Sequence, residues 1–304
     1  MSHKFIEANG LQIAYDEFGQ ADHPAIILIM GLGTQMIAWP EEFCMGLVDQ
    51  GFRVIRFDNR DIGLSEKLEN SKTPGLLKLL LLSRLNLKSK VPYRLLDMAH
   101  DTVGLMDALD IGAAHVVGAS MGGMIAQLVT GHFPERVLSL TSIMSTSGRR
   151  GLPSPSAKVT RQLVRRPKGT GEEDYIKHAL KTWSMIGSPG FSVDQDVLRE
   201  RMLEAYRRSY HPMGYKRQAA AIMASGDRTK ILKSIRKPTL VIHGKEDVLV
   251  PVSGGIDTAR LVQGSKLELI DGMGHDLPRP LMSHFAELIG SHARQQGASQ
   301  RLPS

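Results

Sequence analysis

The segment Gly118–Gly122, with the sequence GASMG, constrains the fold of this chain more than any other feature. It follows the short apolar run 115–117 and precedes the helical run 124–129. A serine between two glycines in this setting is typical of a tight turn, where side chains at positions 118 and 122 would collide with neighbouring backbone. The chain is therefore expected to contain a strand that ends in this turn and a helix that starts directly after it.

Apolar runs alternate with helical patterns along the rest of the chain. The continuous run 25–30 predicts a strand buried on both faces, as in a parallel sheet. Further strands are expected at 53–57, 115–118, 138–144, 239–242 and 267–270, and helices at 40–50, 96–109, 124–129 and 281–292. The turn Asn9-Gly10 predicts a β-hairpin before them. The pattern indicates an α/β fold with a mostly parallel central sheet opened by an N-terminal hairpin.

Residues 148–229 are too long for a simple connection in such a sheet. They carry helical patterns at 175–184 and 197–210. We expect a helical cap inserted into the core, which divides the chain into core residues 1–147, cap residues 148–229 and core residues 230–304.

Composition narrows the class of protein. The single cysteine, Cys44, excludes an intramolecular disulfide and any Cys-x-x-Cys metal or redox site. Neither a signal-peptide core nor an apolar run of ~18 residues is found, which predicts a cytoplasmic protein without a transmembrane segment. The net charge of +7 comes from basic residues that are spread along the chain. We therefore expect a solvated basic surface and no nucleic-acid partner.

One segment, 75–88, is basic and rich in leucine. Leucine at helical spacing favours a helix packed against the cap. The alternative is a lid that handles an apolar substrate or makes weak contact with a membrane surface. At about fourteen residues, the segment is too short to span a bilayer.

Ser120 is the candidate nucleophile, and a serine hydroxyl needs a base to take its proton. Histidine suits this role because its pKa lies near neutral pH. His275 follows the last expected strand, at the carboxyl end of the sheet, where sites in open α/β sheets lie. Weaker candidates are His115, His132, His178, His211 and His243.

A carboxylate is needed to orient the histidine. Asp247 follows the penultimate expected strand, with Glu246 and Asp271 as alternatives. The oxyanion of an acyl-transfer reaction needs hydrogen-bond donors. We assign the backbone N–H groups of Leu32 and Met121 to this role, because glycines beside Leu32 let the backbone approach the reacting carbonyl.

Together these motifs resemble the α/β-hydrolase superfamily over nearly the whole chain. In family order they are Met30-Gly31-Leu32-Gly33, residues 58–65 (DNRDIGLS), the turn at Ser120, the Asp247 loop and Gly274-His275. Most relatives have histidine where this chain has Met30, and glycine where it has Asp61. In both departures the chain resembles the bacterial esterases typified by aclacinomycin methylesterase.

The resemblance implies a serine carboxylesterase for small to medium acyl esters, with lipid-like esters included as an option. Ser120 would attack the ester carbonyl, His275 would carry the proton and Asp247 would orient His275. No metal or organic cofactor is implied. The substrate pocket would include Gly31, Gly33, Met185 and Met213, and the alternative for the methionines is an ordinary place in the core. The alternatives are a perhydrolase, thioesterase or C–C hydrolase with the same three residues, or a non-catalytic ligand-binding protein.

Overall fold

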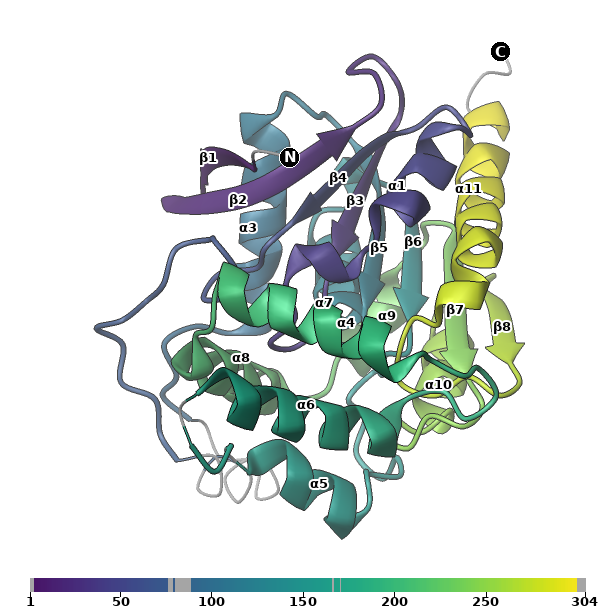
Figure 1. The fold of residues 1–304 in the computed structure, drawn as a ribbon. Helices are drawn as coiled ribbons and strands as arrows, with labels where there is room; N and C mark the ends of the chain where they lie inside the picture. Colours follow the sequence, from purple (N-terminus) through teal and green to yellow (C-terminus); the bar gives the residue numbers. More distant parts are fainter. Residues whose placement is uncertain (1–2, 76–78, 80–88, 166, 170, 300–304) are drawn as a thin grey trace.

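The computed structural model describes residues 3–75, 79, 89–165, 167–169 and 171–299, with side chains described as far as 295. Its centre is an eight-stranded sheet with the order β1-β2-β4-β3-β5-β6-β7-β8 (Figure 1). The strands are β1 (Lys4–Ala8), β2 (Leu11–Phe18), β3 (Ala25–Ile29), β4 (Arg53–Phe57), β5 (Ala114–Ala119), β6 (Val137–Ile143), β7 (Thr239–Gly244) and β8 (Lys266–Ile270). The expected leucine-rich helix or lid at 75–88 lies almost entirely outside the described residues.

The sheet begins with the expected hairpin. Asn9 and Gly10 both have positive φ, 52° and 71°, as a two-residue hairpin turn requires. β1 pairs antiparallel with β2, and β2 pairs antiparallel with β4. The remaining strand pairs are parallel. This confirms the mostly parallel sheet opened by an N-terminal hairpin.

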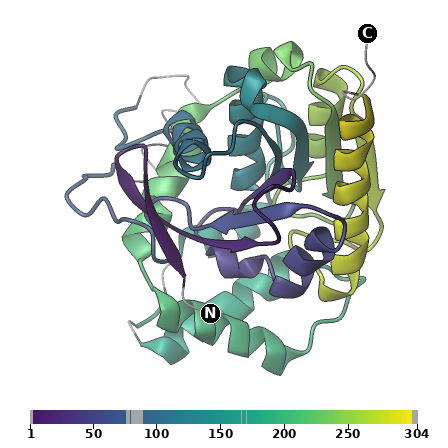
Figure 2. The ribbon, with the colours of Figure 1, turned by 90° about the horizontal axis from the view of Figure 1, so that it is seen from above.

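Helices cover both faces of the sheet (Figure 2). They are α1 (Glu41–Val48) and α11 (Met282–Ser299) on one face, and α3 (Leu95–Ala108) and α4 (Met121–His132) on the other. Successive side chains of β3 point to opposite faces, so Ile27 and Ile29 join the core under α3 and α4, whereas Ile26 and Leu28 join the core under α1 and α11. This explains the continuous apolar run. Helix α11 extends to Ser299, beyond the expected end at 292.

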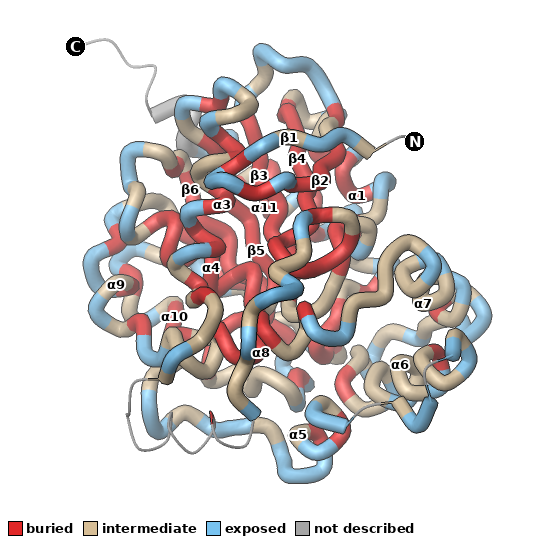
Figure 3. The backbone as a smooth tube through the Cα atoms, turned by 90° about the vertical axis from the view of Figure 1, so that its left-hand side faces the viewer, coloured by how far each residue is buried: buried red, intermediate tan, exposed pale blue. Residues whose placement is uncertain are grey.

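The connection between β6 and β7 is helical. It holds α5 (Ala157–Val164), α6 (Glu172–Ile186), α7 (Gln195–Arg208), α8 (Pro212–Ser225) and α9 (Thr229–Ser234), and α10 (Ser253–Leu261) follows β7. Short 3-10 helices are η1 (Met36–Ala38), η2 (Pro134–Arg136) and η3 (Arg279–Leu281). We call α5–α8 the inserted helices. In Figure 1, α5, α6 and α7 lie beyond the carboxyl ends of β5, β6 and β7, and Figure 3 shows that they are less buried than the sheet.

Sequence patterns predicted α6 and α7 within this connection but not α5, α8 or α9. The buried face of α8 carries Arg217, Gln218 and the alanines 219–221 instead of large apolar side chains. Helix α8 therefore lacks an apolar stripe at helical spacing, which is the feature that predicts a helix from sequence.

Two buried ion pairs join the inserted helices to the loop that follows β4. Arg208, at the end of α7, lies 2.7 Å from the carboxylate of Asp58. Arg217 of α8 lies 2.7 Å from Asp61, and their side chains are 1% and 0% exposed. Asp61 has φ 72°, a conformation that favours glycine. Its carboxylate also accepts a hydrogen bond from the Tyr93 hydroxyl, so an aspartate at this position has a structural partner that glycine would lack.

Within the described part of the chain, no helix combines the length and apolar character needed to cross a membrane.

Candidate active site

Ser120 occupies the tight turn between β5 and α4. Its backbone has φ 55° and ψ −117°, which is strained for a residue with a side chain. A Cβ added at Gly118 would lie closer than 3.0 Å to the Gly122 carbonyl, and one added at Gly122 equally close to the Ile29 carbonyl. Both glycines are therefore required for the turn to form beside β3.

The structure brings Ser120, His275 and Asp247 together. Ser120 Oγ lies 2.9 Å from His275 Nε2, and His275 Nδ1 lies 2.7 Å from Asp247 Oδ2. A carboxylate only accepts hydrogen bonds, so Nδ1 carries the proton. Nε2 is then unprotonated and accepts the Ser120 hydroxyl proton. The arrangement is that of a serine activated by a histidine whose tautomer is set by a carboxylate.

Asp247 is held in its ionised form although it is buried. Its Oδ1 accepts hydrogen bonds from the N–H groups of Leu249 and Val250 at 2.9 and 2.8 Å. Burial, the largest single influence, raises the pKa of Asp247. The charge of His275 and hydrogen bonds from His243, His275 and Val250 outweigh it and lower the pKa to about 2. Asp247 is therefore ionised at neutral pH and able to stabilise a positively charged His275.

The other candidates for the base and for the carboxylate lie away from Ser120 or make other contacts. Glu246 is exposed, and Asp271, also exposed, pairs with Lys245. The His115 ring contacts the Ser139 hydroxyl at 2.8 Å. His243 does approach the site, because its Nε2 lies 3.4 Å from Asp247 Oδ2. The candidates that remain are His132, which is exposed, and two half-buried histidines, His178 in α6 and His211 directly before α8.

The loop after β3 lies directly against Ser120. A Cβ added at Gly31 would be 3.2 Å from the Ser120 Cβ. Gly33, two residues later, contacts α8 instead, because its N–H donates to Gln218 Oε1 at 2.9 Å. Met121 is the first residue of α4, so its N–H has no acceptor within the helix. The loop that carries Gly31 and Leu32 and the first turn of α4 at Met121 are therefore the two segments next to Ser120.

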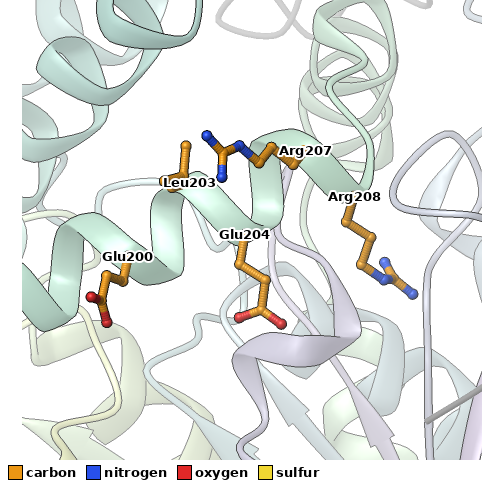
Figure 4. Close-up of a pocket in the computed structure, with 5 residues that line it drawn as sticks. All are labelled: Glu200, Leu203, Glu204, Arg207 and Arg208. Carbon is orange, nitrogen blue, oxygen red and sulfur yellow. The ribbon is translucent and has the colours of Figure 1, made fainter.

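The two predicted pocket methionines are not brought to Ser120 by any described contact. Met185 is half-buried in the last turn of α6, and Met213 is 39% exposed in the first turn of α8. A separate surface cavity of about 540 Å³ lies along α7 (Figure 4). Its lining residues are Glu200, Leu203, Glu204, Arg207 and Arg208. None of them is a candidate catalytic residue. Across the described residues, no three His, Cys, Asp or Glu side chains are grouped so as to hold a metal ion.

Several residues near the site were missed by sequence reasoning. The Ser145 hydroxyl donates to the Ser120 carbonyl at 2.8 Å. Gln218 joins α8 to the loop at Gly33, and Ser188 contacts the loop that carries His275. Each is a common polar residue without a motif around it, so only its neighbours in space identify it.

Comparison with known proteins gives one consistent result. A family model described as the alpha/beta hydrolase fold matches residues 24–278. Rhodomycin D methylesterase DauP of Streptomyces sp. (strain C5) is 28% identical over 296 residues, covering 90% of this chain and 92% of that protein. 3-Oxoadipate enol-lactonase 2 of Acinetobacter baylyi (strain ATCC 33305 / BD413 / ADP1) is 28% identical over 266 residues, covering 88% and 87%. The crystal structure of the enol-lactonase from Burkholderia xenovorans LB400 superposes with a TM-score of 0.73 at 22% identity, covering 96% of this chain and 100% of that one.

Proposed function

Because this chain belongs to the α/β-hydrolase fold family, we propose that it is a serine carboxylesterase that cleaves small to medium acyl esters through an acyl-enzyme on Ser120. Two relatives, named a methylesterase and an enol-lactonase, are hydrolases of ester bonds and support this substrate class. The observation that carries the proposal is the 2.9 Å contact between Ser120 Oγ and His275 Nε2.

In the proposed reaction, Ser120 Oγ attacks the ester carbonyl carbon while His275 Nε2 takes the hydroxyl proton. His275 then gives this proton to the alkoxide oxygen of the leaving group, and the alcohol departs. Water attacks the acyl-enzyme with His275 again as the base, which releases the carboxylic acid and restores Ser120. Asp247 stabilises the positively charged imidazole in both steps.

The oxyanion of each tetrahedral intermediate would be bound by the N–H groups of Leu32 and Met121. The position of Gly31 against Ser120 supports this, because a glycine leaves room for the reacting carbonyl between the two amides. The positive end of α4 points at the same place and adds to the stabilisation.

We propose that residues 148–229 act as a cap over the core residues 1–147 and 230–304 and set the choice of substrate. The position of α5–α7 beyond the carboxyl ends of the parallel strands supports this assignment (Figure 1). Substrate would then lie between the glycines of the loop after β3, Gly31 and Gly33, and cap side chains such as Met185 and Met213. Methionine suits such a role because its side chain adapts to apolar groups of different shape.

The Ser120→Ala variant tests the proposal. It should lower the hydrolysis of p-nitrophenyl acetate and butyrate by at least ~10³-fold while the protein stays folded by circular dichroism. A fluorophosphonate probe should label the wild-type protein and not the variant. Turnover that survives in the variant would remove Ser120 from the mechanism. A wild-type protein that resists the probe would favour a non-catalytic ligand-binding role.

A substrate panel separates the proposed activity from others that use the same three residues. We expect methyl esters and lactones to be hydrolysed faster than matched thioesters, and neither C–C bond cleavage nor perhydrolysis to compete with ester hydrolysis. A higher kcat/KM for a thioester or a C–C substrate would reassign the reaction while leaving Ser120 as its nucleophile.

A further inference from the structure

The segment Ile186–Gly190, at the end of α6, lies against the loop that carries His275. The His275 N–H donates to the Ile186 carbonyl at 2.7 Å, and the Gly190 N–H donates to the Gly272 carbonyl at 2.8 Å. Two backbone hydrogen bonds thus join an inserted helix to the loop of the candidate base.

A side-chain network runs between the same two segments. The Ser188 hydroxyl accepts a hydrogen bond from the Gly274 N–H at 2.8 Å and donates its own proton to Asp276 Oδ1. Asp276 is only 3% exposed. Its other oxygen, Oδ2, has no hydrogen-bond partner within the described part of the chain. Ser188 is therefore the central link between α6 and the two residues that flank His275.

The two backbones are too close to admit a side chain. A Cβ added at Gly274 would lie 2.5 Å from the Gly187 carbonyl, and one added at Gly190 would lie 2.6 Å from the Gly272 Cα. On its other side, the loop is held by the Glu246 N–H, which donates to the Met273 carbonyl at 3.0 Å. The loop is thus clamped between the end of β7 and the end of α6.

A clamp of this kind matters because His275 must meet Ser120 and Asp247 at once. A misplacement of about 1 Å in such a group can cost ~10²-fold in rate. The backbone N–H of His275 donates to Ile186 of α6, an inserted helix, and not to a strand of the sheet.

We propose that Ser188 and Asp276 are positioning residues for His275, and that the segment Ile186–Gly190 couples the inserted helices to proton transfer at Ser120. The inference rests on the proposed function. Burial raises the pKa of Asp276, which fits a carboxyl group enclosed between the two segments. Movement of the inserted helices around a substrate would therefore change the alignment of the base.

Two variants and their matched controls test the inference. Ser188→Ala removes the central link, and Ser184→Ala, in the last turn of α6, removes a hydroxyl of an exposed residue nearby in sequence. Gly190→Ala forces the two backbones apart, whereas Gly171→Ala, at the other end of α6, places a Cβ that meets only Asp174 Oδ2 at 3.9 Å. We expect Ser188→Ala and Gly190→Ala to lower kcat for p-nitrophenyl acetate by ~10-fold or more, with KM nearly unchanged. Both controls should stay within about twofold of wild type.

Three further measurements separate positioning from general destabilisation. Ser188→Thr keeps the hydroxyl and should restore most of kcat. Asp276→Ala removes the acceptor of the Ser188 hydroxyl proton and should lower kcat in the same way as Ser188→Ala. The downfield proton resonance of His275 Nδ1–H, observed by NMR, should shift or broaden in Ser188→Ala and not in Ser184→Ala. An unchanged kcat and an unchanged resonance in folded Ser188→Ala and Gly190→Ala would overturn the inference.

This failure is distinguishable from failure of the proposed function. If wild-type hydrolysis does not depend on Ser120, the esterase proposal is wrong. The His275 resonance then remains as the test of whether Ser188 positions the ring. If hydrolysis depends on Ser120 but is indifferent to Ser188 and Gly190, the esterase proposal stands and the coupling is wrong.

Discussion

Ser120 shows how residue-scale constraints combine at the site. Its positive φ is tolerated because Gly118 and Gly122 leave the space that the turn needs, and because the Ser120 N–H donates to the Ile143 carbonyl at 2.9 Å. The strain raises the hydroxyl toward His275, which lies 155 residues away in sequence. Local sequence thus sets the conformation of the candidate nucleophile, whereas the candidate base comes from a loop that is distant in sequence.

At the same scale, Asp247→Asn tests the role of the carboxylate. An amide in this position can donate to His275 Nδ1, which stabilises the wrong tautomer and leaves Nε2 unable to accept the Ser120 proton. We expect kcat for p-nitrophenyl esters to fall by about 10³–10⁴-fold with an unchanged far-ultraviolet circular dichroism spectrum. Asp271→Asn, at an exposed carboxylate, is the matched control and should keep wild-type activity. Equal activity of the two variants would exclude Asp247 from the mechanism.

At the scale of elements, α8 is tied to the core by polar contacts rather than by an apolar stripe. The Arg217–Asp61 pair and the hydrogen bond from Gln218 Nε2 to the Arg60 carbonyl join it to the loop after β4. Such contacts are directional, so they set where α8 sits and not only that it packs. This helix in turn contacts the loop after β3 through Gln218 and Gly33.

The ion pair can be tested by removing one partner and then both. Arg217→Met leaves the buried Asp61 carboxylate without its charge partner, and the free energy of unfolding should fall by about 3–5 kcal/mol. The double variant Asp61→Gly/Arg217→Met should recover part of this loss, because it removes both charges and places glycine at φ 72°, while the Tyr93 hydroxyl loses its acceptor. Urea denaturation followed by circular dichroism measures both values. A double variant as unstable as the single one would show that the pair is not coupled in this way.

At the scale of the whole molecule, several histidines are partly or fully buried, which favours their neutral form. Burial lowers the pKa of His115 to about 4, with a smaller contribution from His292. Burial also lowers the pKa values of His178, His211 and His292. In the unfolded chain these groups would be protonated as the pH falls through their ordinary value of 6.5. The folded protein therefore binds fewer protons than the unfolded chain in weak acid.

This difference predicts how stability depends on pH. As the pH falls from about 6.5 to about 4, protons bind the unfolded state preferentially, so the free energy of unfolding should decrease. His115 alone accounts for a loss of roughly 3 kcal/mol over this range. Urea denaturation at several pH values measures the slope, which should be smaller for His115→Gln. The prediction fails if the variant and the wild type lose stability equally.

Local patterns were sufficient for the strands, the flanking helices and the turn at Ser120. The apolar run at β3, the Asn9-Gly10 turn and the two glycines around Ser120 each act through neighbours a few residues away. The structure confirmed the α/β fold, although α11 is longer than expected. The catalytic roles of Ser120, Asp247 and His275 stay predictions, which the tests above address.

What the sequence by itself determined is therefore the succession of the core strands and their flanking helices along the chain, and the residue types that can carry acyl transfer. Only the tertiary structure decided how the inserted helices join that core. Asp61 and Arg217 are separated by 156 residues, and Ser188 and Asp276 by 88. Periodicity and turn propensity describe contacts within one element, whereas these polar contacts form only once the packed sheet brings distant segments to the same edge.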